Sequence, residues 1–180
     1  MLFHPTSLDG VRLVELERVG DDRGYFARTF CVREFSANGL QTSFVQHSIS
    51  RTTRTGSIRG MHFQRSPYEE VKLIRCLKGA IYDVLIDIRP ASSTYMRWEA
   101  YELTDKNERE LYVPAGIAHG FQSLQSDTEV SYLISAYFAP ESAAGIRYDD
   151  PAFAIAWPLP VADISDRDRS WPEYLGAMPK

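Results

Sequence analysis

Cysteine is scarce in this sequence, and long apolar runs, internal repeats and linker-like stretches are missing. Cys31 and Cys76 are the two cysteines among 180 residues, and their spacing fits neither a metal site nor a redox pair. We expect both thiols to be reduced and structural. No run of about eighteen apolar residues and no leader-like start is present, which predicts a cytoplasmic protein with no membrane partner.

Charge of one sign is not concentrated anywhere along the chain. Twenty Lys and Arg stand against 24 Asp and Glu, giving a net charge of -4 without a basic stripe. This balance argues against nucleic acid as a partner. The length and the lack of a linker predict one domain over residues 1–180, a size that buries roughly 70% of the unfolded surface.

Short runs rich in aromatic and β-branched residues are abundant, as expected of strands. Two of them, 71–77 and 80–88, alternate around Lys78-Gly79 and predict a hairpin. A turn at 20–24 is predicted to join the first two strands of the chain. Many short strands with little helix predict an all-β (mainly β) fold, a sandwich or barrel of the jelly-roll type. The other strands are predicted at 11–15, 25–30, 43–47, 58–64, 98–103, 110–113, 120–124 and 129–137.

Helices are predicted to be few and peripheral. One short helix is expected at 32–37, ending near Asn38-Gly39, and another after Ser165. From Pro158 onward the chain is polar and irregular, so we expect residues 158–180 to wrap the outside of the barrel.

The segment 57–64 carries an arginine, a glycine and a histidine on one predicted strand. Strand alternation places His62 with Gln64 on one face and Arg59 on the other, unless Gly60 forms a bulge that turns the arginine. A lone histidine in such a strand is more often a hydrogen-bonded core residue than a base. The strand pattern alone leaves both interpretations open.

A lysine and two aspartates share faces with apolar residues in the next two strands. Lys72 is in phase with Ile74 and Cys76, so its charge either reaches the rim or projects into a cavity. Asp83 and Asp87 alternate with apolar residues of the return strand. They are either partners of buried cations or solvated.

Residues 114–120 contain Pro114-x-Gly116-x-x-His119, which closely resembles the second conserved motif of the cupin superfamily. Metal-binding cupins have a first motif with His-x-His and a later glutamate. Here that site offers only His62-Phe63-Gln64. His62 and His119 are too few for the usual metal triad, so we predict no metal and no cofactor.

Five motifs in order are similar to those of the dTDP-4-dehydrorhamnose 3,5-epimerase family, whose fold is a cupin-type jelly roll. They lie at 22–26, 59–64, 72–75, 114–121 and 149–151, and the resemblance runs from about Gly20 to Asp168. The family inverts carbons beside the ketone of a nucleotide-linked sugar and needs no cofactor. The resemblance changes the interpretation of His62 from a core residue to a base.

By that resemblance, His62 accepts the proton and Asp168 orients it, Tyr132 donates a proton, and Lys72 stabilises the enolate oxygen. These residue types suit the chemistry, because a proton on carbon leaves only when the neighbouring ketone is stabilised as it gains charge. The implied substrate-binding positions are Arg23, Phe26, Arg28, Gln46, Ser48, Arg59, His119, Phe138 and Arg167. The resemblance also implies a homodimer whose exchanged N-terminal strands bring Arg23 and Phe26 to the partner's site.

Four substrate-contacting positions depart from the family's pattern. Arg28 replaces a usual Glu, Ser48 an Asn, Glu70 a Gln and Ala143 a Glu. A glutamate accepts hydrogen bonds, whereas Arg28 donates them, so Arg28 can pair only with acceptor atoms of a base. A cytosine, or another base with an acceptor edge, is therefore a hypothesis alongside thymine. The loss of a carboxylate at Ala143 bears on whether both carbons are inverted.

The leading interpretation is a 3,5-epimerase acting on a nucleotide-linked 4-keto-6-deoxyhexose. The alternatives are a 3-epimerase or ketoisomerase on the same scaffold, or the same epimerisation of a CDP- or other NDP-sugar. A metal-dependent cupin such as a dioxygenase is disfavoured by the missing His-x-His. A non-catalytic sugar-nucleotide binding module would leave His62, Lys72, Tyr132 and Asp168 together unexplained.

Overall fold

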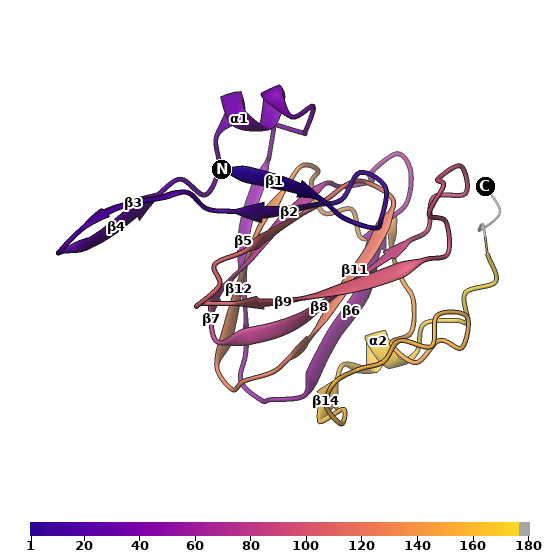
Figure 1. The fold of residues 1–180 in the computed structure, drawn as a ribbon. Coiled ribbons are helices and arrows are strands. Elements are labelled where there is room, and N and C mark those ends of the chain that lie inside the picture. Colours follow the sequence, from indigo (N-terminus) through magenta and orange to yellow (C-terminus); the bar gives the residue numbers. More distant parts are fainter. Residues whose placement is uncertain (177–180) are drawn as a thin grey trace.

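The structure is a computed structural model that describes residues 1–176 of the chain. Its strands form two sheets that face each other and a separate two-stranded ribbon (Figure 1). The first sheet has the order β1 (Leu2–Pro5), β2 (Arg12–Glu15), β10 (Glu110–Val113), β7 (Lys72–Lys78), β12 (Thr128–Ile134) and β5 (Gln46–Thr52). The second has the order β13 (Ala143–Gly145), β6 (Ser57–Gln64), β11 (Ile117–Ser123), β8 (Ala80–Asp87) and β9 (Trp98–Thr104), with β14 (Asp163–Ile164) beside β6.

This arrangement is a cupin-like jelly roll, and the all-β prediction is confirmed. The main core lies where the two sheets face each other and takes alternate side chains from both, such as Ile74 and Val130 from one sheet and Leu85 and Phe121 from the other. Burying one face of each sheet in this way is what removes the apolar half of an alternating strand from water. Cys76 lies in the same core as a free thiol.

The predicted hairpin around Gly79 is wrong, although both of its strands exist. β7 pairs with β10 and β12 in the first sheet, whereas β8 pairs with β9 and β11 in the second. The Lys78-Gly79 turn therefore carries the chain from one sheet to the other. Gly79 has a φ of +79°, and a Cβ there would lie 2.7 Å from Thr128 Oγ1. An alternating pattern with a tight turn does not reveal this difference, because both connections require the same turn residues.

The N-terminal strands also differ from the prediction. β2 does not pair across the turn at 20–24 but joins β1 and β10. A separate ribbon forms from β3 (Arg18–Asp21) and β4 (Gly24–Ala27), and it extends away from the barrel (Figure 1). We call this ribbon the arm. Val19 and Phe26 are directly paired on it and are 75% and 70% exposed.

Other boundaries were partly wrong. The strand predicted at 43–47 is β5, which begins three residues later, and the one predicted at 129–137 is β12, which ends at Ile134. The short strands β1, β3, β13 and β14 were not predicted. The helix α1 (Val32–Ala37) agrees with the prediction, and its buried Phe35 packs against the outer face of the first sheet through Val14, Leu73 and Tyr112.

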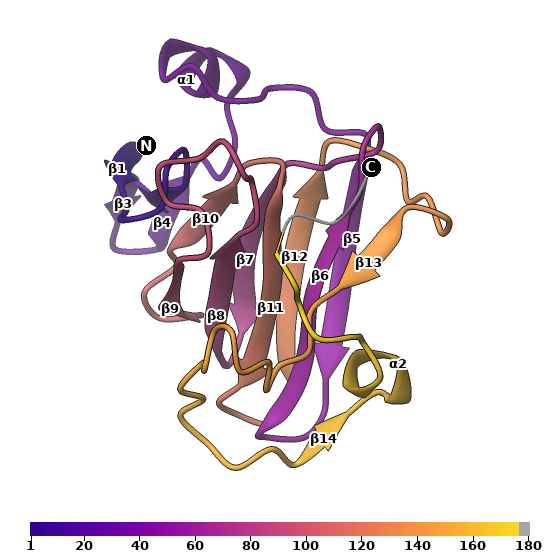
Figure 2. The same ribbon diagram turned by 90° about the vertical axis from the view of Figure 1, so that its right-hand side faces the viewer.

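The C-terminal segment returns to the second sheet. β14 pairs in parallel with β6, and the one-turn helix α2 (Asp166–Arg169) follows it, as Figure 2 shows beside β6. Ser165 caps this helix by accepting a hydrogen bond from the Asp168 N–H at 3.1 Å. The wrap predicted for 158–180 includes residues 177–180, which lie outside the described residues. Within residues 1–176, no helix has the length and apolar character needed to cross a membrane.

Candidate active site

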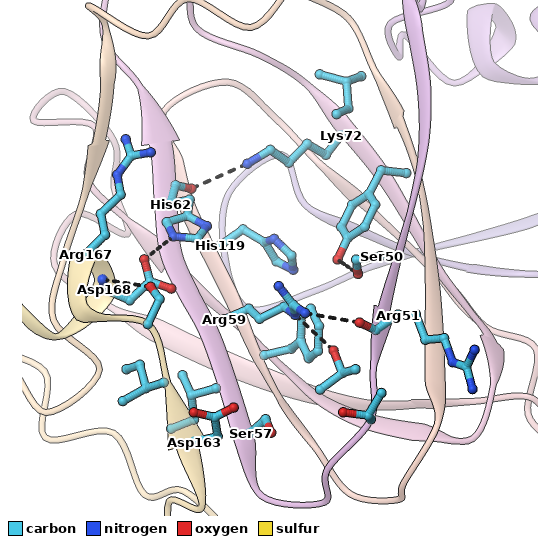
Figure 3. A pocket seen from close by; sticks show the side chains of 18 residues that line it. Ser50, Arg51, Ser57, Arg59, His62, Lys72, His119, Asp163, Arg167 and Asp168 are labelled. Atoms are coloured by element: carbon cyan, nitrogen blue, oxygen red, sulfur yellow. Dashed lines mark hydrogen bonds and ion pairs between the residues drawn. The ribbon is translucent and has the colours of Figure 1, made fainter.

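The largest cavity, about 620 Å³, opens between the two sheets beside the C-terminal helix. Side chains from β5, β6, β7, β11, β12 and the segment around α2 line it (Figure 3). Seven of the residues singled out from the sequence meet here: His62, Lys72, Tyr132, Asp168, Arg59, His119 and Arg167. Residues separated by more than a hundred positions in the chain are thus brought to one cavity.

A bulge at Gly60 turns both Arg59 and His62 toward this cavity. His119 pairs with His62 and Phe121 with Arg59, so two steps along β11 match three along β6. Gly60 has a φ of +130°, and a Cβ there would lie 2.4 Å from the Cα of Gly120. Only glycine satisfies both constraints. The bulge is the alternative that the sequence analysis left open for Arg59.

His62 and Asp168 form a hydrogen-bonded pair at the wall of the cavity. The His62 Nε2 lies 2.6 Å from Asp168 Oδ1, with the imidazole 46% exposed and the carboxylate 7% exposed. Burial alone raises the pKa of Asp168, but the hydrogen bond and charge of His62 and the Gly60 N–H outweigh burial and hold that pKa below its usual value. An ionised carboxylate only accepts hydrogen bonds, so Nε2 carries the proton and Nδ1 is free to accept one.

Tyr132 reaches the same cavity from β12 in the opposite sheet. Its hydroxyl lies 3.2 Å from Ser50 Oγ on the neighbouring strand β5. Burial raises the pKa of the Tyr132 hydroxyl far above its usual value, and the hydrogen bond with Ser50 opposes this shift only in part. The hydroxyl therefore stays protonated at neutral pH. Tyr132 is equipped to give a proton and not to take one.

Lys72 projects into the cavity and does not extend to the rim. Its side chain is 11% exposed, and its Nζ lies 3.0 Å from Glu70 Oε1. The same ammonium donates to the backbone carbonyl of His62 at 3.4 Å, which brings it beside the imidazole (Figure 3). A cation is thus held close to the residue that can accept a proton.

A second histidine–carboxylate pair lies next to the first. His119 Nε2 lies 3.0 Å from Asp83 Oδ2, and the two side chains are 6% and 0% exposed. Burial raises the pKa of Asp83, while the charges of His119 and Lys72 and the hydrogen bond from His119 oppose that rise. The strand pattern had marked Asp83 as a possible partner of a buried cation, but it did not identify His119 as that partner.

Two arginines supply positive charge at the cavity. The Arg59 guanidinium donates to Thr52 Oγ1 at 2.9 Å and to the Arg51 carbonyl at 3.1 Å. Arg167 lies over the Trp171 ring at 5.1 Å. Guanidinium groups held in this way match the paired oxygens of phosphate groups.

A smaller pocket of about 230 Å³ shares His62, Lys72 and Arg167 with the main cavity. Gln46, Glu70, Phe138 and Ala143 line it. The Phe138 N–H donates a hydrogen bond to Gln46 Oε1 at 3.0 Å. Phe138 is 60% exposed at the pocket. An exposed aromatic ring beside a polar cavity is suited to stacking on a planar ligand.

Four predicted binding residues do not line either pocket of this chain. Arg23 lies on the arm and pairs with Asp21, and Phe26 is exposed on the same ribbon. Arg28 pairs with Glu34 at 2.9 Å, and Ser48 is exposed on β5 opposite Tyr132 in the register. The arm extends away from the barrel, so Arg23 and Phe26 are not brought to the site within one chain (Figure 1).

The assembled groups suit acid–base chemistry on a carbon beside a carbonyl. His62 offers a free imidazole nitrogen, Tyr132 a bound proton on the other sheet, and Lys72 a cation for the oxygen that gains charge. Among residues 1–176, no group of three or more His, Cys, Asp and Glu side chains is arranged to hold a metal ion. Ser50 and Thr52, which contact Tyr132 and Arg59, were not predicted from the sequence. Glu70 was named only as a departure from the family's pattern, and its contact with Lys72 was not predicted.

Comparison with known proteins agrees with this geometry. The family model for dTDP-4-dehydrorhamnose 3,5-epimerase matches residues 5–175. The enzyme of that name from Methanothermobacter thermautotrophicus is 44% identical, with 94% of this chain and 92% of the relative covered. The one from Sinorhizobium fredii is 40% identical, with 96% and 89% covered.

Solved structures give the same result. The dTDP-4-dehydrorhamnose 3,5-epimerase from Bacillus anthracis, solved with TDP and PPi bound, superposes with a TM-score of 0.93 at 38% identity, covering 96% of this chain and 99% of that chain. ChmJ from Streptomyces bikiniensis, a 3'-monoepimerase in complex with dTDP-quinovose, gives 0.85 at 32% identity, covering 94% and 86%. This chain, with its His62–Asp168 pair facing Tyr132 across a jelly-roll cavity, belongs to the dTDP-4-dehydrorhamnose 3,5-epimerase family.

Proposed function

We propose that this protein is an epimerase that inverts C5 and C3 of a nucleotide-linked 4-keto-6-deoxyhexose of the dTDP-4-dehydro-6-deoxyglucose type. The observation that carries the proposal is the His62–Asp168 pair at 2.6 Å in the cavity that also holds Tyr132 and Lys72. Membership of the family supports the same activity. The two carbons are the neighbours of the ketone, so one acid–base apparatus serves both.

Each inversion begins when His62 removes the proton from a carbon beside the ketone. The electrons of the broken C–H bond form a carbon–carbon double bond, and the carbonyl electrons move to the oxygen as an enolate. The Lys72 ammonium stabilises that oxygen, and Asp168 supports the imidazolium. Tyr132 then gives a proton to the opposite face of the carbon and is reprotonated from water, while His62 returns its proton to water. The position of Tyr132 on the sheet opposite His62 supports this division of roles.

The nucleotide and diphosphate are proposed to lie at the mouth of the two pockets. Arg59, His119 and Arg167 are candidates for holding the diphosphate and sugar, and Phe138 with Gln46 for holding the base. Relatives solved with TDP or a dTDP-sugar support a nucleotide-sugar substrate. Ala143 and Glu70 differ from the family's pattern at the smaller pocket, which keeps two alternatives: inversion at C3 alone, as in ChmJ, and a nucleotide other than dTDP.

We propose further that the working form is a homodimer in which the arm completes the partner's site. The arm presents the directly paired Val19 and Phe26 to solvent, which is costly for an isolated monomer. Arg23 lies at its turn, 90% exposed. An arm that reaches a second copy would bring an arginine and an aromatic ring to a site that needs both.

Hydrogen exchange in heavy water tests the activity. Incubation with dTDP-4-dehydro-6-deoxyglucose should incorporate deuterium at C5 and C3, located by NMR, with formation of the inverted sugar. Deuterium at C3 alone would establish the 3-epimerase alternative, and no exchange at either carbon would refute the epimerase proposal. Binding of dTDP and CDP, measured by calorimetry in parallel, decides the nucleotide, and equal affinities would refute base reading through Arg28.

Complementation between two inactive variants tests the shared site. Arg23→Ala and His62→Ala proteins should each be weakly active alone. After mixing under conditions that let subunits exchange, a hybrid dimer should carry one intact site out of two and reach about half of the wild-type rate per dimer. A mixture as inactive as its components, despite hybrid formation shown by native mass spectrometry, would contradict the shared site.

A further inference from the structure

Glu70 is a buried carboxylate that the proposed reaction does not use. It lies immediately before β7, two residues ahead of Lys72, and lines the smaller pocket. Its side chain is 8% exposed, and its Oε1 lies 3.0 Å from Lys72 Nζ. Both charges of this ion pair are therefore nearly withdrawn from water, at the wall of the active site.

The second oxygen of Glu70 has no hydrogen-bond partner among the described residues. A buried charge without compensation is strongly destabilising, so such groups persist only when they are paired. Here the ammonium of Lys72 is the compensating group. The carboxylate is thus dedicated to the lysine and is not part of a wider surface network.

The contacts of Lys72 leave one of its three N–H groups for the cavity. One N–H faces Glu70 Oε1 and another donates to the His62 carbonyl at 3.4 Å. Without these contacts the four-carbon stem has many rotamers, and the ammonium would spend most of its time away from one position. The two contacts limit the rotamers of Lys72 where its side chain lines the cavity, and Figure 3 shows the one with the His62 carbonyl.

We infer that Glu70 is a positioning residue that fixes the Lys72 ammonium for the substrate's ketone oxygen; this inference rests on the proposed function. Glu70 does not touch the reacting atoms. It removes the rotamer freedom of the lysine before the substrate arrives, so that the charge on the enolate meets a cation already in place. A chain with an uncharged residue at this position would hold the lysine less firmly.

Replacing Glu70 by Ala and by Gln separates this role from a structural one. Glu70→Ala should lower kcat for exchange about 10- to 100-fold, a larger factor than any change in the Kd for dTDP, because the lysine that Glu70 contacts acts on the ketone. Glu70→Gln keeps an acceptor oxygen for the ammonium and should recover kcat to within about fivefold of wild type. Glu69→Gln, the same change at the exposed neighbour, is the matched control and should behave as wild type.

A double variant tests whether the effect passes through the lysine. In a Lys72→Ala background, replacing Glu70 by Ala should change kcat by less than about twofold, since the residue it positions is gone. Additive losses would overturn the inference, as would an unchanged kcat in Glu70→Ala or a parallel loss of dTDP affinity. If Glu70→Ala does not fold, Glu70→Asp, which shortens the side chain by one methylene, serves in its place.

A crystal structure of the Glu70→Ala protein gives a readout that does not depend on activity. The Lys72 ammonium should leave its position beside the His62 carbonyl. If the ammonium stays in place, the inference is wrong, whatever the substrate proves to be. Failure of the proposed function would instead appear as the absence of exchange in the wild-type protein, so the two failures are distinguishable.

Discussion

Two histidine–carboxylate pairs lie side by side in the cavity, and their environments differ more than their chemistry. His62 and His119 are direct register partners on adjacent strands. The His62 ring is 46% exposed to the cavity, whereas the His119 ring is 6% exposed. The partner of His62 has a pKa held below its usual value, and the partner of His119 has a pKa raised by burial.

The difference indicates which pair exchanges protons with a ligand. A base must reach its substrate and return its proton to water, which suits the exposed His62 ring better than the nearly buried His119 ring. The ionised Asp168 supports a charged imidazole, while Asp83 is enclosed on β8 beneath the cavity wall. The proposed function therefore assigns a chemical role to His62 and a structural or binding role to His119.

Removing the imidazole of the exposed pair should have the largest effect. His62→Ala should lower the rate of deuterium incorporation by about 10³-fold or more, because His62 is the exposed imidazole beside Lys72 in the cavity. NMR-detected exchange measures this rate. The Kd for the nucleoside diphosphate should change little, and a parallel loss of binding would indicate a structural role for His62.

Changing its carboxylate partner should have the next largest effect. Asp168→Asn leaves a side chain of the same size that can donate as well as accept hydrogen bonds. The His62 tautomer with its proton on Nε2 is then no longer selected, and the imidazolium has no negative charge beside it. We expect kcat to fall about 10²-fold with KM nearly unchanged. A wild-type kcat in this variant would show that the 2.6 Å contact is not part of the reaction.

The same change in the buried pair should cost much less activity. Asp83→Asn keeps a hydrogen-bond acceptor for His119, and the loss in kcat/KM should be no more than about tenfold, the effect of one weakened hydrogen bond. Steady-state kinetics of the two Asn variants, measured side by side, compares the pairs directly. If Asp83→Asn proved as damaging as Asp168→Asn, the assignment of roles to the two pairs would be reversed.

The smallest expected effect is on the free energy of unfolding, and its dependence on pH should be opposite for the two pairs. Asp168 has a pKa below its usual 3.8 in the folded protein. Its contribution to the free energy of unfolding is therefore present above pH 3.8 and is lost as the pH falls through the folded pKa. Wild type should therefore exceed Asp168→Asn by about 1 kcal/mol near pH 7, with the gap closing below about pH 4. Urea unfolding across this range measures the gap.

Asp83 should show the opposite trend. Its folded pKa is raised by burial, so the stability associated with its proton is present at low pH and is lost as the pH rises through the folded pKa. The Asp83→Asn variant has no carboxyl group to titrate, so its free energy of unfolding should rise relative to that of wild type as the pH increases. Parallel trends in the two variants would contradict the contrast between the pairs.

Much of the fold could be predicted from local pattern. Period-two alternation identified most of the central strands, and the helix at 32–37 was found from its composition and its stop at Gly39. Pairing was less predictable. The strands on either side of Gly79 looked like a hairpin yet belong to different sheets, because alternation records which face is buried and not which strand lies alongside.

The site was predictable in its members and not in its arrangement. Residue types and motif order singled out His62, Lys72, Tyr132 and Asp168, and all four line one cavity. The strand pattern gave no signal for the contact of Ser50 with Tyr132 or of Glu70 with Lys72, since a serine or glutamate in such a pattern is ordinarily solvated, and Glu70 was named only as a departure from the family's pattern. They matter only because β5 lies beside β12 and because the chain before β7 turns inward.

The amino-acid sequence by itself determined the all-β class, the chemistry available and the glycine that a bulge requires, since these follow from local sterics and from side-chain groups. The tertiary structure decided which histidine is exposed, which carboxylate has a lowered pKa and which contact of the lysine is buried. Those properties depend on burial and on neighbours distant in the chain. Desolvation and close charge–charge contacts arise only when the strands are packed together.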